Sequence, residues 1–241
     1  MRYGIFADVH SNSEAFHAVI DSLKKENIDT YVSIGDIVGY GAEPSYCIEL
    51  TKKITDKVIA GNHDLAAAGV FTTSYFNDYA KEAILWTKNI LSAKEASYLK
   101  ALKYIYENKD ITAVHGSLNE PREFHYILST SQALATFGLM KTEVCFTGHS
   151  HLPLISAKTH KGVSFLPDQK VTIKKGVSYI INVGSVGQPR DGDPRASFAI
   201  FDTKTSYVEI KRVPYDIKKA AGKILAAGLP QVLAARLGEG R

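Results

Sequence analysis

Short apolar runs that end directly at glycine, histidine or aspartate constrain the fold of this chain more than any other feature. Through the first half of the chain these runs alternate with stretches of helix-like spacing, an order typical of α/β proteins. We expect buried strands over residues 3–7, 30–34, 57–60, 111–114, 144–147 and 179–183. Residues 198–201 and 207–213, joined by a polar stretch, are expected to pair as a hairpin. The sequence therefore predicts an α/β fold.

Helix starts are marked by serines followed three residues later by glutamate. This capping-box pattern occurs at Ser11 with Glu14, which opens a helix reaching about residue 27. It recurs at Ser92 with Glu95, which divides a helical stretch over 77–102. Further helices are expected over residues 44–53 and from 217 to 225, the last continuing through the leucines at 229, 233 and 237.

No linker, internal repeat or low-complexity segment interrupts the chain. We therefore expect a single domain over residues 1–241, with a helical insertion at about 66–102 and a C-terminal helical tail at about 216–238. The tail is expected to dock on the body of the protein. A homo-oligomer formed through the tail is the alternative.

Composition excludes several classes of protein. The formal net charge is +4, from 29 lysines and arginines against 25 acidic residues, and 45% of residues are hydrophobic. These values exclude disorder, collagen-like repeats and a strongly basic nucleic-acid-binding tail. The two cysteines, Cys47 and Cys145, are far apart, as in proteins of reducing compartments. Asp8 interrupts the N-terminus too early for a secretory signal, and no apolar run approaches the ~18 residues of a membrane helix. We expect a cytoplasmic protein with no membrane contact.

Residue types that bind metals follow the predicted strands. They occur in five groups: Asp8-Val9-His10, Gly35-Asp36, Gly61-Asn62-His63-Asp64, His115-Gly116 and Gly148-His149-Ser150-His151. An Asp-x-His alone is expected about 0.4 times by chance in this chain, whereas the Gly-Asn-His-Asp tetrad is expected only about 0.001 times. Each group has an ordinary reading as a turn or strand cap. Together they place five of the eight histidines at the edge where open α/β sheets bind ligands. His17, His125 and His160 are expected to be ordinary surface or structural residues.

In this order, the five groups resemble the calcineurin-like metallophosphoesterase superfamily, in its small single-domain prokaryotic phosphodiesterase branch. The resemblance implies two mixed β-sheets packed as a sandwich and flanked by helices, a four-layer αββα fold. It implies one metal held by Asp8, His10, Asp36 and His151, with Asp36 bridging to a second metal held by Asn62, His115 and His149. It also implies that His63 faces the substrate and is oriented by Asp64.

The implied chemistry is physically consistent. Two divalent cations about 3.5–4 Å apart need an anionic bridge such as the Asp36 carboxylate to offset their repulsion. A hydroxide bridging both metals would attack phosphorus in line. His63 would protonate the leaving oxygen or stabilise its charge, if a carboxylate fixes the ring and raises its pKa. Imidazole, carboxylate and amide ligands suit Mn, Fe, Zn, Co or Ni better than Mg or Ca, and we favour manganese.

Residues 182–195 form a second region of interest, rich in glycine, proline and arginine. Arg190 could grip a phosphate with two hydrogen bonds, or Arg190 or Arg195 could pair with a neighbouring aspartate. The segment resembles the N-P-G-S-V-G-Q-P-R stretch of the same branch, except that Val183 replaces the proline. Tyr40, close to Asp36, could stack on a base or cap the core.

These features predict a two-metal phosphodiesterase acting on small nucleotide-type phosphoesters such as dinucleoside polyphosphates. A broad phosphomonoesterase or protein phosphatase is an alternative, although residues 35–41 lack the arginine that protein phosphatases carry near the bridging aspartate. A non-catalytic scaffold of the same fold is a second alternative, disfavoured because His63 and all seven ligands are present. A nuclease is a third, disfavoured because no basic cluster with interleaved aromatics is evident.

Overall fold

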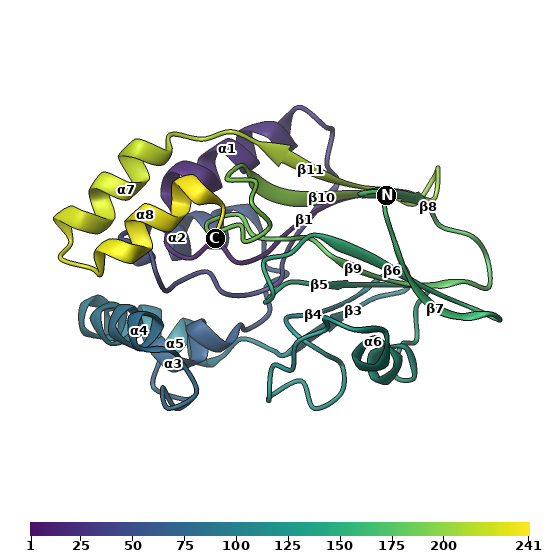
Figure 1. The fold of residues 1–241 in the computed structure, drawn as a ribbon, viewed down its shortest axis with the longest axis horizontal. Helices are drawn as coiled ribbons and strands as arrows, with labels where there is room; N and C mark the ends of the chain where they lie inside the picture. Colours follow the sequence, from purple (N-terminus) through teal and green to yellow (C-terminus); the bar gives the residue numbers. More distant parts are fainter.

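The computed structural model describes residues 1–241 and contains two β-sheets (Figure 1). The five-stranded sheet has the order β2-β1-β10-β11-β8 and the six-stranded sheet the order β3-β4-β5-β9-β6-β7. Both are mixed: β1 pairs parallel with β2 and antiparallel with β10, while β4, β5 and β9 are parallel neighbours. The strands are β1 Arg2–Phe6, β2 Thr30–Ser33, β3 Ile105–Glu107, β4 Thr112–Val114, β5 Val144–Thr147, β6 Leu154–Thr159, β7 Gly162–Leu166, β8 Lys170–Thr172, β9 Ser178–Asn182, β10 Ala196–Asp202 and β11 Tyr207–Val213.

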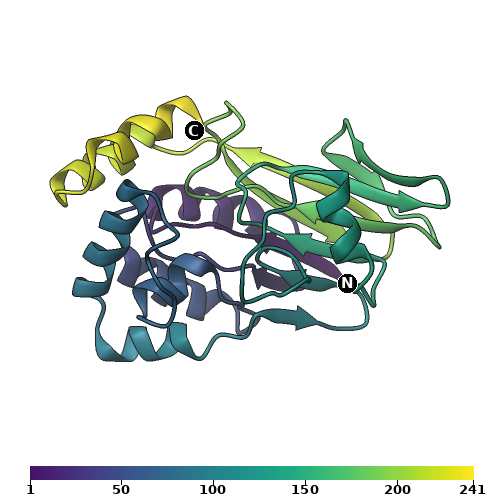
Figure 2. The same ribbon diagram turned by 60° about the horizontal axis from the view of Figure 1, so that its bottom comes forward.

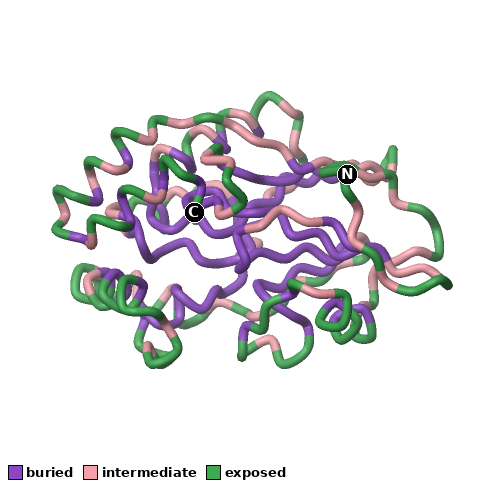
Figure 3. The backbone as a smooth tube through the Cα atoms, in the orientation of Figure 1, coloured by how far each residue is buried: buried purple, intermediate pink, exposed green.

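The two sheets pack face to face because the side chains of their central strands alternate. Along β1, Tyr3 and Ile5 point into the core between the sheets, whereas Phe6 packs in the cluster that contains α1 (Ser13–Lys24). Gly4 lies on the α1 side, where a Cβ would come within 2.9 Å of Leu23. The central strands are buried along most of their length (Figure 3). Both faces of β1 are therefore covered.

Helices cover the outer faces of both sheets. Helix α1 and α2 (Pro44–Ile54) share a core cluster with β1 and β10 of the first sheet. Helix α6 (Thr130–Phe137) packs on the second sheet, in a cluster with Cys145 of β5 and Ile180 of β9. The resulting order of helix, sheet, sheet and helix confirms the predicted four-layer α/β sandwich.

The remaining helices gather at one end of the sandwich, away from the N-terminus (Figures 1 and 2). They are α3 Asn62–Ala67, α4 Asp78–Ile90, α5 Ala93–Lys100, α7 Ile217–Ala226 and α8 Gln231–Glu239. Ala80 of α4, Ile224 of α7 and Leu233 of α8 share one core cluster, which also contains Tyr40. The C-terminal tail therefore packs beside a residue of the candidate site. None of the helices combines the length and the hydrophobicity that a membrane-spanning segment requires.

Two of the predicted local elements are wrong, and several further elements were not predicted. The predicted capping box at Ser11 is wrong: Ser11 has a φ of 54°, and Asn12 caps α1 by accepting a hydrogen bond from the Ala15 amide. The predicted strand at 57–60 is also wrong, because Val58 and Ile59 make only isolated bridges. The second capping box, at Ser92 and Glu95, is confirmed at the start of α5. Strands β3, β6, β7 and β8 and helices α3 and α6 were not expected from the sequence.

Candidate metal centre

The predicted ligands meet at the carboxyl ends of parallel strands from both sheets. Asp8 follows β1, Asp36 follows β2, His115 follows β4, and His149 and His151 follow β5. Asn62 is the first residue of α3. We call these residues, with His10, the donor cluster; none of the seven is more than 8% exposed. The topology thus brings together residues separated by more than a hundred positions in the chain.

The backbone of the donor cluster is unusually strained. Five of its members have positive φ angles: Asp8 (55°), His10 (48°), Asp36 (52°), His149 (68°) and His151 (61°). Left-handed backbone is uncommon outside glycine and costs free energy, so it persists where surrounding structure enforces it. Such strain tends to concentrate at functional sites.

Glycines in the motifs let the carboxylates approach neighbouring backbone. A Cβ at Gly61 would lie 2.0 Å from an oxygen of Asp36, and a Cβ at Gly148 would lie 2.7 Å from an oxygen of Asp8. Any side chain at either position would displace a carboxylate of the donor cluster. The glycines of Gly-Asn-His-Asp and Gly-His-Ser-His are therefore required by packing.

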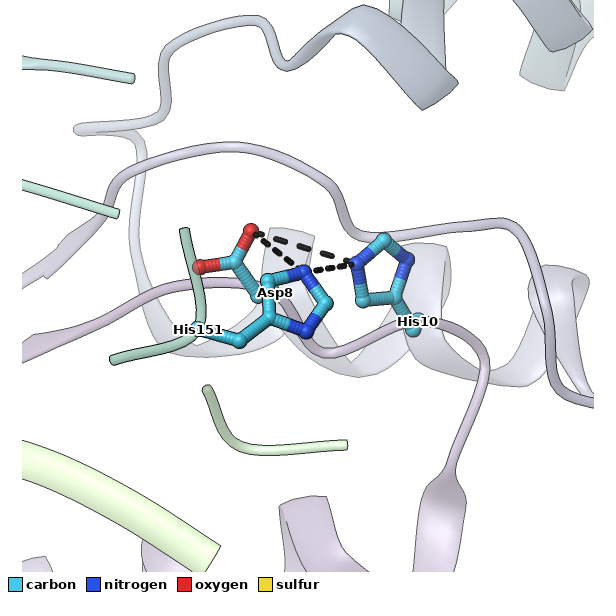
Figure 4. A group of neighbouring side chains, drawn as sticks. All are labelled: Asp8, His10 and His151. Carbon is cyan, nitrogen blue, oxygen red and sulfur yellow. Dashed lines mark hydrogen bonds and ion pairs between the residues drawn. The ribbon is translucent and has the colours of Figure 1, made fainter. Parts of the chain in front are cut away.

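One half of the donor cluster consists of Asp8, His10 and His151 (Figure 4). An Asp8 oxygen lies 3.9 Å from Nε2 of His10 and 3.5 Å from Nε2 of His151. The two Nε2 atoms are 3.0 Å apart. Three donor atoms from β1 and β5 loops thus converge on one point.

Asp36, His115 and His149 form the other half. An Asp36 oxygen lies 3.2 Å from Nε2 of His115 and 3.7 Å from Nε2 of His10, so this carboxylate faces both halves; Asp8 also approaches the second half, at 3.8 Å from Nε2 of His115. The buried amide oxygen of Asn62 has no hydrogen-bond partner. The Asp36 carboxylate, between the two halves, therefore lies where a bridging carboxylate is expected.

Backbone carbonyls set the tautomers of three histidines. Nδ1 of His10 donates to the Val38 carbonyl (3.1 Å), and Nδ1 of His151 donates to the Gln188 carbonyl (2.6 Å). Nδ1 of His115 makes the same kind of bond to a carbonyl, at 2.6 Å. In a neutral ring the opposite nitrogen, Nε2, then carries a lone pair. The 3.0 Å contact between two such nitrogens, and the unpartnered Asn62 oxygen, fit side chains arranged to hold cations.

Burial controls the electrostatics of the donor cluster. It lowers the pKa of His10, His149 and His151 well below the ordinary value, which favours the neutral, metal-ligating form of each ring. Burial also raises the pKa of Asp8 to about 8. Burial would lower the pKa of His115, but the Asp36 and Asp8 carboxylates and the hydrogen bond to the Ile34 carbonyl together outweigh it and raise that pKa to about 9.

His63 lies against the donor cluster, but Asp64 does not orient its ring. A ring nitrogen of His63 is within 4.8 Å of the donor atoms of His10 and Asp36. The Asp64 carboxylate instead accepts hydrogen bonds from the amides of Gly61 and Val38, each at 3.1 Å. Consecutive helical side chains point in different directions, so Asp64 cannot face the His63 imidazole. The expected Asp64–His63 contact is thus absent, and Asp64 holds the motif to the segment after Asp36.

Aromatic packing holds the His63 ring in place. Its centroid lies 4.6 Å from that of Tyr40 and 4.9 Å from that of Phe76. Tyr40 is only 6% exposed and packs among apolar residues of α4, α7 and α8. Of its two predicted roles, Tyr40 therefore caps the core, although its edge also lines the cavity described below.

Arg190 reaches the site without an acidic partner. One of its terminal nitrogens donates to the Tyr40 hydroxyl (3.2 Å) and to the Gln188 side chain (2.9 Å). None of the ion pairs in the structure includes Arg190, and its buried Nε has no partner. Arg195 does pair with Asp193, at 2.6 Å. The pairing considered from sequence thus holds for Arg195 only, and Arg190 keeps donors available for an anion.

Comparison with known proteins identifies the family. A family model for the calcineurin-like phosphoesterase superfamily domain matches residues 1–206. The chain belongs to this superfamily. It is accordingly a metal-dependent phosphoester hydrolase, as predicted, and its clustered histidines and aspartates are candidate ligands for divalent metals.

Whole-length relatives of the phosphoesterase support this assignment. An uncharacterized protein of Methanocaldococcus jannaschii is 38% identical over 242 residues, spanning 98% of this chain and 97% of that protein. The crystal structure of a metallophosphoesterase from Sphaerobacter thermophilus is 38% identical, with a TM-score of 0.88 over 100% of this chain and 99% of its own. A hypothetical protein from Pyrococcus horikoshii, 24% identical, shares the fold with a TM-score of 0.79 over 100% of this chain and 98% of its own.

A cavity of about 680 Å³ opens beside the donor cluster of the phosphoesterase. Asp36, Asn62, His63, His149 and Arg190 contribute to its lining. Sequence reasoning missed its most prominent feature, an aromatic wall formed by Phe71, Tyr75, Phe76, Phe124 and Tyr126. The signal was present as aromatic residues clustered at 71–76, inside the predicted helical insertion, and at 124–126, for which no element was predicted.

Proposed function

We propose that the protein is a two-metal phosphodiesterase that hydrolyses small nucleotide-type phosphoesters, dinucleoside polyphosphates among them. The observation that carries the proposal is the pair of half-sites, Asp8/His10/His151 and Asp36/His115/His149, with Asp36 facing both. Asn62 would complete the second half. Divalent metals held there would activate water as the nucleophile and neutralise charge on the phosphoryl oxygens. Manganese is the metal we favour for the test.

The protein's own groups would then bind and orient the ester. Arg190, with donors free of any carboxylate, would hold a phosphoryl oxygen beside the donor cluster. His63, wedged between Tyr40 and Phe76 at the cavity edge, would donate a hydrogen bond from its neutral ring to the leaving oxygen and stabilise the negative charge that develops there, because burial lowers its pKa to about 4. A leaving group that departs as an alkoxide gains most from such stabilisation.

Two alternatives make different predictions. A phosphomonoesterase is favoured by one observation, the presence of Arg190 at the site, since a guanidinium can also bind a terminal phosphate. A non-catalytic scaffold is disfavoured by the strain and burial concentrated in the donor cluster, which a protein-binding surface does not need.

The buried thiols of Cys47 and Cys145 support the proposed cytoplasmic location. Both are free and buried, and burial raises the pKa of each. Free cysteines of this kind are typical of reducing compartments.

Hydrolysis assays with a generic aryl substrate test the proposal. Protein supplied with Mn²⁺ should hydrolyse bis(p-nitrophenyl) phosphate faster than p-nitrophenyl phosphate, and a chelator should abolish both activities. Faster turnover of the monoester would favour the phosphomonoesterase. Turnover of neither ester by protein shown to contain metal would favour the scaffold.

A further inference from the structure

The aromatic wall contains one buried ring that packing holds in place, Phe124, and tyrosine rings that are accessible to a ligand. Phe124 is only 4% exposed, and its ring lies 5.5 Å from that of Phe71 and 5.8 Å from that of His115. Its φ of 53° is rare for a bulky residue, so tertiary packing must hold the segment in place. Phe124 therefore anchors the segment that carries Tyr126.

Two tyrosines of the wall remain open to a ligand. Tyr126 lies nearly parallel to the His149 imidazole, with ring centroids 4.0 Å apart and planes inclined by 16°. It is nonetheless 44% exposed, and Tyr75 is 82% exposed. Both line the cavity. Large exposed aromatic rings beside a catalytic centre are suited to stacking on a planar group.

The charged residues that line the cavity indicate how many phosphate groups a bound substrate can carry. Outside the donor cluster, Glu123 and Arg190 are the fully charged residues of the lining, which contains no lysine. Metals held at the donor cluster would balance the reacting phosphate, but further phosphates would bring negative charges past Glu123 with only Arg190 to balance them. Three uncharged amides outside the donor cluster also line the cavity, at Asn77, Asn119 and Gln132. Such amides can form hydrogen bonds with the edge of a heteroaromatic ring.

We infer that the preferred substrate is a phosphodiester with one planar heteroaromatic group, such as a nucleoside, next to a single reacting phosphate. Tyr75 and Tyr126 are then the specificity-determining residues that contact this group. The cavity volume of about 680 Å³ lies within the range of about 300–1,000 Å³ common for small-ligand sites. This inference rests on the proposed phosphodiesterase activity and narrows it, because it ranks a single phosphodiester above a dinucleoside polyphosphate.

Two esters with the same leaving group isolate the contribution of the planar group. Thymidine 5′-(p-nitrophenyl phosphate) and methyl p-nitrophenyl phosphate both release p-nitrophenolate, so their chemical steps are closely matched. We expect kcat/KM to be roughly tenfold or more higher for the thymidine ester, the effect of one stacked base. Thymidine 5′-phosphate should also bind more tightly than methyl phosphate by titration calorimetry, a measurement that needs no turnover.

Variants of Tyr75 and Tyr126 test whether the aromatic wall causes the preference for the thymidine ester. Tyr75→Ala and Tyr126→Ala should each reduce the ratio of kcat/KM between the two esters severalfold, while Tyr75→Phe should preserve it. Tyr79→Ala is the matched control, because Tyr79 is 51% exposed on neighbouring α4 and does not line the cavity. The control should keep the wild-type ratio.

Each outcome bears on one claim. Equal kcat/KM for the two esters, or an unchanged ratio in both alanine variants, overturns the inference and leaves the phosphodiesterase proposal standing. Faster hydrolysis of diadenosine tetraphosphate than of the thymidine ester overturns the single-phosphate part. Failure to hydrolyse any of the diesters overturns the proposed function itself.

Discussion

The donor cluster and the aromatic wall border the same cavity but are built in opposite ways. Donor-cluster residues are at most 8% exposed; all but Asn62 lie in loops that follow regular strands, and five of the seven are held in left-handed backbone by their surroundings. The wall comes from irregular segments before α4 and before α6, and its outermost ring, Tyr75, is 82% exposed. The cluster therefore tolerates little change, whereas the accessible wall residues can change without disturbing the core. Reaction type and substrate preference are thus separable in this molecule.

The largest expected effect comes from removing the shared carboxylate. Asp36→Asn keeps the shape of the side chain but removes the charge that faces both halves of the donor cluster. We expect loss of bound metal and a fall in kcat/KM beyond the roughly 10–100-fold typical of residues that only support ligands. Metal analysis together with diester hydrolysis measures both. Wild-type activity with two metals per chain would show that Asp36 does not bridge the halves.

Replacing His63 tests whether this side chain contributes to the reaction without binding a metal. His63→Ala should lower kcat for an ester with an alcohol leaving group by about 10²–10³-fold, the range for loss of one hydrogen-bond donor that stabilises developing charge, with metal content near normal; steady-state kinetics and metal analysis measure the two. His17→Ala is the control, because His17 is exposed and bonds only to Tyr46. Loss of metal from the His63 variant would instead make His63 a ligand, in keeping with its position within 4.8 Å of the His10 and Asp36 donor atoms.

A smaller effect is expected from replacing Arg190, which lines the cavity that the donor cluster and the aromatic wall share. Arg190→Gln should reduce kcat/KM by about 10–100-fold, because a charged hydrogen bond to phosphate contributes about 1.5–3 kcal/mol. Arg195→Gln, from the same loop, should have little effect, because that arginine pairs with Asp193. Similar losses in both variants would point to a general role of the loop instead of phosphate binding by Arg190.

The smallest expected effect concerns stability and involves neither region directly. Burial alone would raise the pKa of Glu14, but hydrogen bonds from Lys223, Ser13 and Lys219 hold it below the ordinary value of 4.5. This pairing of α7 with α1 therefore stabilises the fold above about pH 4.5, and the stabilisation fades as the pH falls through the lowered pKa. Lys223→Met, which removes the ion pairs with both Glu14 and Glu43, should cost roughly 1 kcal/mol at pH 7 and less at acid pH. Urea unfolding at pH 7 and pH 4 measures the difference; an equal cost at both pH values would contradict the pairing.

Most of the donor cluster could be anticipated because its residue types are chemically distinctive and follow buried strands. The layers were predictable for a related reason, since the runs that form β1, β5 and β9 are continuous and apolar. Helix α3 could not be predicted from the sequence, because six residues are too few to form a helix from propensity alone. It is held instead by the bond from the Gly61 amide to Asp64. The edge strand β7 alternates weakly in burial and carries little signal.

Contacts between distant loops explain the remaining differences. The expected strand at 57–60 is reduced to bridges with Ser33 and Lys103, which no local pattern specifies. The aromatic wall depends on Phe124 packing against Phe71, 53 positions earlier in the chain. Sequence patterns report which residues can do chemistry, whereas the side chains that contact the rest of a substrate depend on how irregular segments meet.

The left-handed backbone at Asp8, His10, Asp36, His149 and His151 has an evolutionary consequence. At each of these positions, glycine or asparagine would adopt the positive φ with less conformational strain than the residue present. Selection for activity must therefore hold the ligands in place against substitutions that would relieve conformational strain. In a lineage that no longer needed the reaction, glycine or asparagine should accumulate first at these five positions, while Asn62 and His115, which have no such strain, should persist longer.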